Sequence, residues 1–473
     1  MSTVVKPGVG KNAPVNRSRV VAATIVGTAV EWYDYFVYAS AAALVFPTLF
    51  FKQAGPTMAT ILSFLTVGIS FLFRPLGAFI AGHLGDQIGR RPMLVFTLIM
   101  MGVSTTLIGV LPTYAQISIG APLLLMLLRI VQGLSAGGEW GGAALMAVEH
   151  APSNKRGLFG AAPQIGVPLG LLLSSAMMAI MNILFPGDLF LQWGWRIPFL
   201  FSVVLIIVGY WIRRSVDESP VFQEISERHQ KTKMPAFKLF RYFAPLVLLS
   251  ALVFAGNNAS GYMTTGGYIQ NYATTRIGLD RGVVLWAATI AGLSWLIWTL
   301  VAGIVSDKIG RRNTFIIGWI MQVATLLTLF PLVNTKTVWG LILGLVLLTM
   351  ALGFTYGPLP SWYTELFPAS VRFSGVSISY GLGSILGGAF SPVVAAALLS
   401  ATGTSWSITI YLVGVVIIGF LATMLLRDRR GIPLSPTAED LQRTGMYIWQ
   451  KPTVIPPEAE TSVKQTDKVE TTK

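Results

Sequence analysis

Long runs of apolar residues, separated by short polar stretches, occupy most of the chain between residues 20 and 426. At about 1.5 Å per residue, a helix of roughly 20 apolar residues crosses the ~30 Å hydrocarbon layer of a bilayer. Backbone N–H and C=O groups find no water there, and a helix satisfies them internally. The pattern therefore predicts an all-α membrane protein with twelve transmembrane helices, near residues 20–46, 57–82, 92–111, 121–148, 157–185, 196–212, 242–272, 282–305, 313–333, 337–364, 374–400 and 405–426.

The polar loops between the apolar runs repeat along the chain. Residues 82–91 read GHLGDQIGRR, and residues 303–312 read GIVSDKIGRR. A second pair, 149–156 (EHAPSNKR) and 365–372 (ELFPASVR), recurs with nearly the same offset. Internal repetition of a half-chain is common among secondary transporters, whose halves move about a central site. We therefore expect two pseudo-symmetric six-helix bundles.

The largest polar interruption separates these halves. It runs from residue 213 to residue 241 and is rich in charged residues. The segment after residue 427 contains several prolines and few apolar residues, so we expect it to be disordered. The predicted domains are a cytoplasmic tail (1–19), a first bundle (20–212), a cytoplasmic connector (213–241), a second bundle (242–427) and a cytoplasmic disordered tail (428–473).

Composition and charge fit this picture. Hydrophobic residues make up 53% of the chain and charged residues only 11%, against roughly a quarter charged in soluble domains. Most Lys and Arg residues fall on one side of the predicted topology, so the positive-inside rule places both termini in the cytoplasm. The net charge of +14 reflects that bias and does not indicate nucleic-acid binding. The absence of cysteine excludes disulfides and thiolate metal sites.

Several motifs carry a family resemblance. The doubled loop resembles the signature of the major facilitator superfamily. Residues 31–35 (EWYDY), 73–77 (FRPLG), 137–142 (GGEWGG) and 193–199 (WGWRIPF) resemble its metabolite:proton symporter family, and in particular the shikimate and other organic-acid permeases. The resemblance covers residues 20–427. It implies alternating access between the bundles, with uptake driven by protons across the bacterial cytoplasmic (inner) membrane.

Charged residues inside the membrane are costly and are therefore functional candidates. Glu31 and Asp34 are three positions apart and share a face of the first helix. Two carboxylates in a poorly hydrated cavity repel one another, which favours proton uptake by one of them. In the fourth helix, the resemblance associates an Arg followed by Gln-Gly with proton transfer. The alternative roles are helix-to-helix hydrogen bonding for Glu31 and Asp34 and a purely structural ion pair for Arg129. The predicted proton-coupling residues are Glu31, Asp34, Arg129 and Glu139.

Other polar residues of the spans are candidates for substrate contact. Arg74 lies beside Pro75 within a predicted helix, and its guanidinium could hold a carboxylate through two hydrogen bonds. Charge pairing with Glu31 or Asp34 is the alternative. The second half has no acid or base deep in its helices. Its first helix offers amides and hydroxyls, which can bind the hydroxyl and carboxylate groups of a substrate without coupling to protons. The predicted substrate-binding residues are Arg74, Tyr35, Tyr38, Gln132, Gln164, Asn257, Asn258 and Tyr262.

The doubled loops lie at the membrane surface, and the resemblance implies that they latch the halves together. The Asp of each loop would accept from backbone amides at a helix start and pair with an Arg, which holds the outward-open state. We expect the first loop to carry most of this role, although Gln87 replaces the basic residue usual after its Asp. The predicted gating residues are Asp86, Arg90, Arg91, Asp307, Arg311, Arg312, Glu149, Arg156, Glu365 and Arg372.

The favoured function is proton-coupled import of a small organic acid (shikimate-like, aromatic, or a di- or tricarboxylate) by a monomer without cofactor or metal. A carrier of a zwitterionic osmolyte such as proline or betaine stays open, as does a transport-dead membrane sensor. An enzyme is disfavoured because the three histidines have no metal-ligand spacing and no phosphate-binding loop is present. Residues 166–170 (GVPLG) depart from the antiporter pattern, which favours symport.

Overall fold

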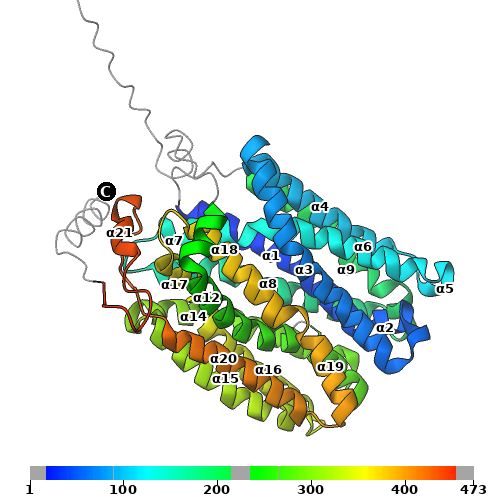
Figure 1. Cartoon of the computed structure of the whole chain (residues 1–473). Coiled ribbons are helices and arrows are strands. Elements are labelled where there is room, and N and C mark those ends of the chain that lie inside the picture. The colour runs from blue at the N-terminus through cyan, green and yellow to red at the C-terminus, as the bar shows by residue number, and fades with distance from the viewer. Residues whose placement is uncertain (1–16, 89, 215–234, 266, 454–473) are drawn as a thin grey trace, which may run out of the picture.

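The structure is a computed structural model that describes residues 17–88, 90–214, 235–265 and 267–453. At residues 81–94, 138–139 and 262–265, among others, the description covers the backbone only. Residues up to 214, blue to cyan in Figure 1, form one group of long helices, and residues from 235 onward, green to orange, form a second group beside it. The predicted connector lies largely outside the described residues.

The first group contains a helix that is interrupted by a 3-10 turn at residues 136–138. Apolar side chains on nearly every face explain why these segments are helices packed within a membrane rather than amphipathic surface helices. The elements of the first group are α1 (Arg17–Leu44), α2 (Phe46–Leu49), η1 (Lys52–Ala54), α3 (Pro56–Ile88), α4 (Arg90–Val110), α5 (Tyr114–Ile117), α6 (Gly120–Ser135), η2 (Ala136–Gly138), α7 (Glu139–Glu149), α8 (Arg156–Leu184), η3 (Phe190–Gly194), α9 (Arg196–Leu200) and α10 (Ser202–Arg214).

The second group repeats this order, and its corresponding helix breaks at residues 357–358. Its elements are α12 (Pro235–Thr265), α13 (Tyr268–Tyr272), η4 (Ala273–Ile277), α14 (Arg281–Ile309), α15 (Arg311–Val333), α16 (Val338–Tyr356), α17 (Leu359–Leu366), α18 (Arg372–Gly383), η5 (Ser384–Ala389), α19 (Ser391–Thr402), α20 (Trp406–Leu425), η6 (Pro436–Ala438) and α21 (Glu439–Gln442).

Most predicted spans are found as helices of sufficient length. Among the described residues, ten helical stretches are long and apolar enough to cross a membrane, and Val95–Val110 is a shorter apolar helix. The remaining predicted span corresponds to α1, which has 28 residues and carries Glu31 and Asp34. Together these account for the twelve predicted helices.

The two groups meet along α8 and α14, which cross closely where both carry glycine. A Cβ atom built on Gly303 of α14 would lie 2.8 Å from the carbonyl oxygen of Gly157 and 2.7 Å from the Cβ of Ala161, both on α8. These distances are too short for a side chain. Small residues therefore allow the backbones of the two halves to approach at this crossing.

The prediction of a disordered tail from residue 428 is wrong for residues 428–453. Leu426 and Tyr447 form an isolated antiparallel bridge, and the segment continues through η6 and α21. Gln442 is buried: its Oε1 accepts from the backbone N–H of Ala369, and its Nε2 donates to Pro433 O. In Figure 1, α21 lies at the same end of the molecule as α7 and α17. We call residues 426–453 the C-terminal strap.

Candidate functional site

A buried carboxylate lies in the middle of α1. Asp34 is 2% exposed. Its Oδ2 accepts a hydrogen bond from Thr105 Oγ1 of α4 (2.9 Å), and its Oδ1 accepts one from Ser202 Oγ of α10 (2.5 Å). Glu31 is also buried, one helical turn away on α1. Three helices of the first half thus hold the group that the sequence singled out for proton coupling.

A chain of hydrogen bonds connects Asp34 to a buried cation. Arg129 Nη1 donates to Gln132 Oε1 (2.9 Å), and Gln132 Nε2 donates to Thr105 Oγ1 (2.7 Å), which in turn donates to Asp34. Arg129 and Gln132 are one turn apart on α6, so the spacing of the predicted polar stripe is what aligns them. The structure therefore brings Asp34, Gln132 and Arg129 together.

The Arg129 guanidinium lies on aromatic rings rather than on a carboxylate. Its Cζ is 4.1 Å from the ring centre of Tyr38 and 5.1 Å from that of Tyr35. The side chain is buried, and within the described part of the chain Nε and Nη2 have no hydrogen-bond acceptor. Cation–π contacts stabilise a guanidinium without neutralising it, so the charge remains available to an anion.

The second half contains a neutral counterpart of this network. Asn257 of α12 follows Asp34 at nearly the spacing of the doubled loops. Its Nδ2 donates to Thr355 Oγ1 of α16 (2.6 Å), and Gln322 Nε2 of α15 donates to the same hydroxyl (2.5 Å). Both halves thus use a Thr and a Gln at this depth, but only the first presents a carboxylate.

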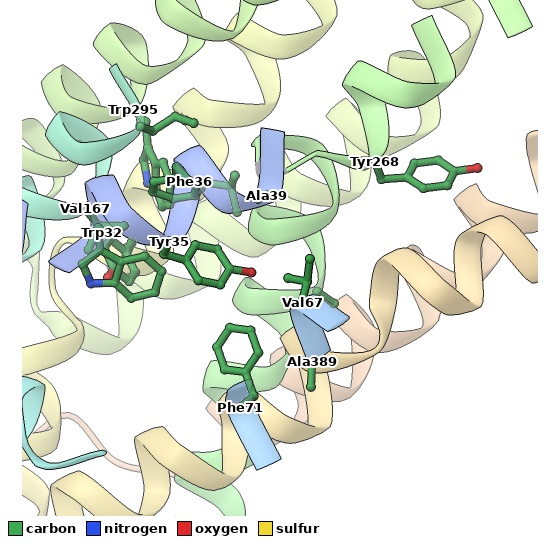
Figure 2. Packing of buried hydrophobic residues seen from close by; sticks show 14 of the residues in the cluster. Trp32, Tyr35, Phe36, Ala39, Val67, Phe71, Val167, Tyr268, Trp295 and Ala389 are labelled. Atoms are coloured by element: carbon green, nitrogen blue, oxygen red, sulfur yellow. The ribbon is translucent and has the colours of Figure 1, made fainter. Parts of the chain in front are cut away.

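Arg74 of α3 lies against the same aromatic cluster. Its guanidinium is 4.7 Å from the ring centre of Phe71 and 5.5 Å from that of Trp32. Figure 2 shows Trp32, Phe71 and Tyr35 grouped together. Among the residues that the structure describes, no carboxylate lies within ion-pair distance of Arg74, and its Nε is buried without an acceptor. Arg74 therefore lies on aromatic rings, and the alternative of charge pairing with Glu31 or Asp34 stays a prediction.

Other predicted substrate residues have structural partners across the molecule. Gln164 of α8 accepts from Trp140 Nε1 (2.7 Å) and donates to the carbonyl oxygen of Tyr356 (3.1 Å), so it links the two halves. Asn258 donates weakly to Ser384 O (3.3 Å). The side chains of Tyr262 and Glu139 lie outside the described residues.

The second doubled loop latches the two halves together. Asp307, near the end of α14, accepts from the backbone N–H of Gly157 (2.7 Å) and Leu158 (2.9 Å) at the start of α8. A helix N-terminus presents unpaired N–H groups and a positive dipole, which favour a carboxylate there. Arg311 also donates to Asp307 (2.7 Å). The side chains of Asp86, Arg90 and Arg91 lie outside the described residues, so the expected larger role of the first loop stays a prediction.

Two ion pairs cross between the halves in reciprocal fashion. Glu365 of α17 pairs with Arg156 of α8 (3.5 Å), and Glu149 of α7 pairs with Arg372 of α18 (3.3 Å). The repeated 149–156 and 365–372 segments thus exchange partners. Arg311 adds a bond to Glu365 (3.1 Å), with both side chains fully buried. We call the end of the molecule that carries these contacts the gate end; the halves are joined there, and its role in gating stays a prediction.

The strap extends the gate end in a way that the sequence did not predict. Arg156 donates to Ile432 O (2.7 Å), and Arg372 donates to Leu434 O (3.0 Å) and Gln442 Oε1 (3.0 Å). Two gating arginines, one from each half, therefore bind the strap as well as a carboxylate. Arg312 does not join the latch; it donates to Met424 O in the last turn of α20.

The halves also touch toward the opposite end of α1. Asn271 Nδ2 of α13 donates to Ala43 O of α1 (2.9 Å). Gly267, with φ of +131°, approaches Ala39 so closely that a Cβ atom would lie 2.8 Å from its carbonyl oxygen. Glycine adopts this backbone conformation without steric cost. The central polar residues are thus enclosed by contacts on both sides.

Comparison with known proteins decides the family. A model described as Major Facilitator Superfamily matches residues 25–385. The chain belongs to the major facilitator superfamily.

Relatives within this superfamily are similar over most of their length. The inner membrane metabolite transport protein YhjE of Escherichia coli K12 is 39% identical over 88% of this chain and 96% of its own. The shikimate transporter of the same organism is 36% identical (89% and 97%). The proline/betaine transporter of Salmonella typhimurium is 31% identical (90% and 87%). These names confirm a membrane transporter rather than an enzyme.

Solved structures give the same architecture. The crystal structure of a D-xylose-proton symporter superposes with a TM-score of 0.69, covers 88% of this chain and 99% of its own, and is 18% identical. At this identity the likeness concerns the fold alone. It confirms the major facilitator fold, with twelve helices in two pseudo-symmetric bundles.

Proposed function

We propose that this member of the superfamily is a proton-coupled symporter that imports a small organic acid by alternating access. It acts as a monomer in the bacterial inner membrane, with both termini in the cytoplasm. The excess of Lys and Arg on one side of the spans supports that orientation. Reporter fusions at each terminus test it directly.

The observation that carries the proposal is the link from Asp34 to Arg129. A buried carboxylate that binds a proton becomes neutral and can donate a hydrogen bond, so its partners must reorganise. Asp34 reaches Arg129 through Thr105 and Gln132, so protonation at Asp34 changes the hydrogen bonding and the field at the cation. A change in charge near Arg129 alters the affinity of the site for an anionic substrate. Symport requires such a coupling between proton binding and substrate binding.

The substrate class follows from the buried donors at the centre. Arg74 Nε, Arg129 Nε and Nη2, and Trp295 Nε1 are buried without an acceptor among the described residues. Buried donors without acceptors are costly, and a ligand that supplies acceptors relieves that cost. A carboxylate is the acceptor that a guanidinium binds most strongly. The nearby rings of Trp32, Tyr35 and Phe71 suit a ring or a short apolar chain.

The similarity to the shikimate transporter supports an organic acid, and the similarity to the proline/betaine transporter supports a zwitterion. Two cations near one site favour the acid, because a zwitterion also brings a positive charge toward Arg74 and Arg129. We therefore prefer a shikimate-like, aromatic or di- or tricarboxylate substrate.

Proton coupling is tested by Asp34→Asn in proteoliposomes with an imposed pH gradient. We expect uphill accumulation of a radiolabelled organic acid to be abolished, while exchange of internal for external substrate persists. Asp188→Asn, the same change at an exposed carboxylate, should behave like the wild type. Normal accumulation by Asp34→Asn would place the coupling group elsewhere.

Substrate class is tested by comparing transport of shikimate, aromatic acids, citrate, proline and betaine. Arg74→Ala should raise the half-saturating concentration of an acid by roughly tenfold or more, since a charge-assisted hydrogen bond is lost. The value for a zwitterion should change less. Equal effects on both classes, or transport of proline and betaine only, would contradict the organic-acid assignment.

A further inference from the structure

A cavity of about 310 Å³ lies at the gate end, away from the central residues. The strap forms most of its wall, and the start of α15 contributes the rest. The lining includes Arg312, Arg427, Asp428, Arg429, Ile432 and Ile448. Three arginines and one aspartate face this small space.

The three arginines are fixed by neutral oxygens rather than by carboxylates. Arg427 donates to the carbonyls of Tyr447, Ile448 and Gln450. Arg429 donates to those of Leu366, Gln442 and Leu441. Arg312 donates to Met424 O. In the described part of the molecule, none of the three forms an ion pair.

Two N–H donors of these arginines have no hydrogen-bond acceptor among the described residues. Nε of Arg312 and Nε of Arg429 are buried and have no acceptor among the described residues. Asp428 lines the same cavity and offsets one of the three positive charges, but its carboxylate accepts from the backbone N–H groups of Arg312 and Arg430 rather than from a guanidinium. Burial lowers the pKa of Arg429 to about 10, against an attraction to Glu365 that raises it, so the group stays charged at neutral pH. The cavity thus holds positive charge in fixed positions.

The cavity also lies next to the end of a membrane-spanning helix, α20. The bridge between Leu426 and Tyr447 directly follows the last residue of α20, Leu425. Ile448 and Trp449 next to it are exposed, and the rings of Tyr447 and Trp449 stack with centres 4.7 Å apart. Exposed aromatic side chains beside the end of a membrane helix are typical of the membrane interface.

We propose that this cavity binds a phosphate group, and that the group belongs to an anionic phospholipid of the same leaflet. Guanidinium groups bind phosphate through several charge-assisted hydrogen bonds. A headgroup phosphate would lie between Arg312, Arg427 and Arg429, and its acyl chains would extend past Ile448 and Trp449 along α20. A free phosphate ester offers the same chemistry without the chains.

Occupancy would stabilise the closed gate. Arg429 and Ile432 line the cavity, and the carbonyl oxygen of Ile432 accepts from Arg156 of the first half. A ligand that fixes this part of the strap therefore favours the conformation in which the halves are joined there. Anionic lipid would act on the gate from the membrane side.

The test is ligand binding to the purified full chain in detergent, measured by thermal shift and by native mass spectrometry. The probes are dioctanoyl phosphatidylglycerol, dioctanoyl phosphatidylcholine and inorganic phosphate. We expect the phosphatidylglycerol to bind at least about tenfold more tightly than the phosphatidylcholine. Arg312→Gln and Arg427→Gln should weaken that binding roughly tenfold or more, because each removes a charge-assisted contact. Arg443→Gln is the matched control, since Arg443 lies on the strap, is paired with Glu439 and does not line the cavity.

Thr453→Glu tests the site with all three arginines in place. Thr453 lines the cavity, so a carboxylate there should occupy the arginines and abolish phosphatidylglycerol binding. Binding of phosphatidylglycerol alone identifies lipid as the source, and competition by inorganic phosphate identifies a soluble ester; either outcome supports a phosphate site. Equal binding of both lipids, or unchanged binding by Arg427→Gln and Thr453→Glu, would overturn it.

Discussion

Thr105 makes two hydrogen bonds to other side chains at the centre of the first bundle, one to Asp34 and one from Gln132. Thr105→Val keeps the shape and removes both. Gln132 Nε2 is then buried without its acceptor, at a cost of about 1–3 kcal/mol. We expect proton-driven accumulation to fall by roughly tenfold, measured at a fixed pH gradient in proteoliposomes, with Thr105→Ser close to the wild type. Accumulation by the Val variant that matches the wild type would remove Thr105 from the link.

The sequence identified the charged members of this network and missed the hydroxyl members. Asp34 and Arg129 stand out because an ionised group within an apolar run has no structural explanation. Thr105 and Ser202 do not, because Ser and Thr in membrane helices commonly bond to a carbonyl one turn back; Thr105 does this as well, to Met101 O. Only the crossing of α1, α4 and α10 reveals the second role.

Among the helices, the crossing of α8 and α14 is a contact between the two halves at which side-chain size matters. Gly303→Val would place methyl groups against Gly157 O and Ala161 Cβ, both already closer than 3.0 Å to a Cβ atom at that position. Alternating access implies that the halves separate at this crossing when the gate end opens, so we expect the variant to fold but to favour the open gate. Transport should fall by roughly tenfold or more, while purified protein remains monodisperse. Gly414→Val, a change at a glycine with no neighbour within 4 Å, is the matched control.

Normal uptake by Gly303→Val would indicate that α8 and α14 adjust their distance freely. Unfolding of this variant in detergent would instead indicate that the crossing is needed in every conformation. Both outcomes differ from the expected loss of transport in a folded protein.

The strap explains why the expectation of disorder was wrong. The prediction from composition considered only the apolar residues of the segment itself, which are too few to form a core. The segment does not build one; its buried residues, Met446 and Tyr447, pack against a core that the helices already supply. Its ordering also depends on arginines that donate to its carbonyls from α8 and α18. Neither contribution is local in the sequence.

For the transporter as a whole, we predict that the Asp307 contacts between the halves influence the balance between closed and open gate. Asp307→Asn removes the charge that accepts from the N–H groups of Gly157 and Leu158 and from Arg311. A loss of ~1.4 kcal/mol shifts the ratio of the two conformations about tenfold. We therefore expect a shift toward the open gate.

Cysteine accessibility measures that shift, since the chain has no cysteine of its own. Ser361 is fully buried on α17, facing Gly160 of the first half. In inside-out vesicles, Ser361→Cys should react slowly with an impermeant maleimide and about tenfold faster when combined with Asp307→Asn. Ser435→Cys, on the strap and not at the crossing, should react equally in both backgrounds. Unchanged labelling at Ser361→Cys would show that the latch does not control the gate.

The reciprocal pairs at the gate end have the geometry of an isologous dimer. Glu149 binds the Arg of the other half, Arg372, and that half's Glu365 binds Arg156 in return. In a two-fold dimer, residue i contacts residue j while j contacts i, so one mutation alters the interface twice. Here both halves belong to one chain, so a mutation alters only one of the two contacts. The halves can therefore differ at corresponding positions, as they do at Asp34 and Asn257, which are separated by nearly the offset of the doubled loops.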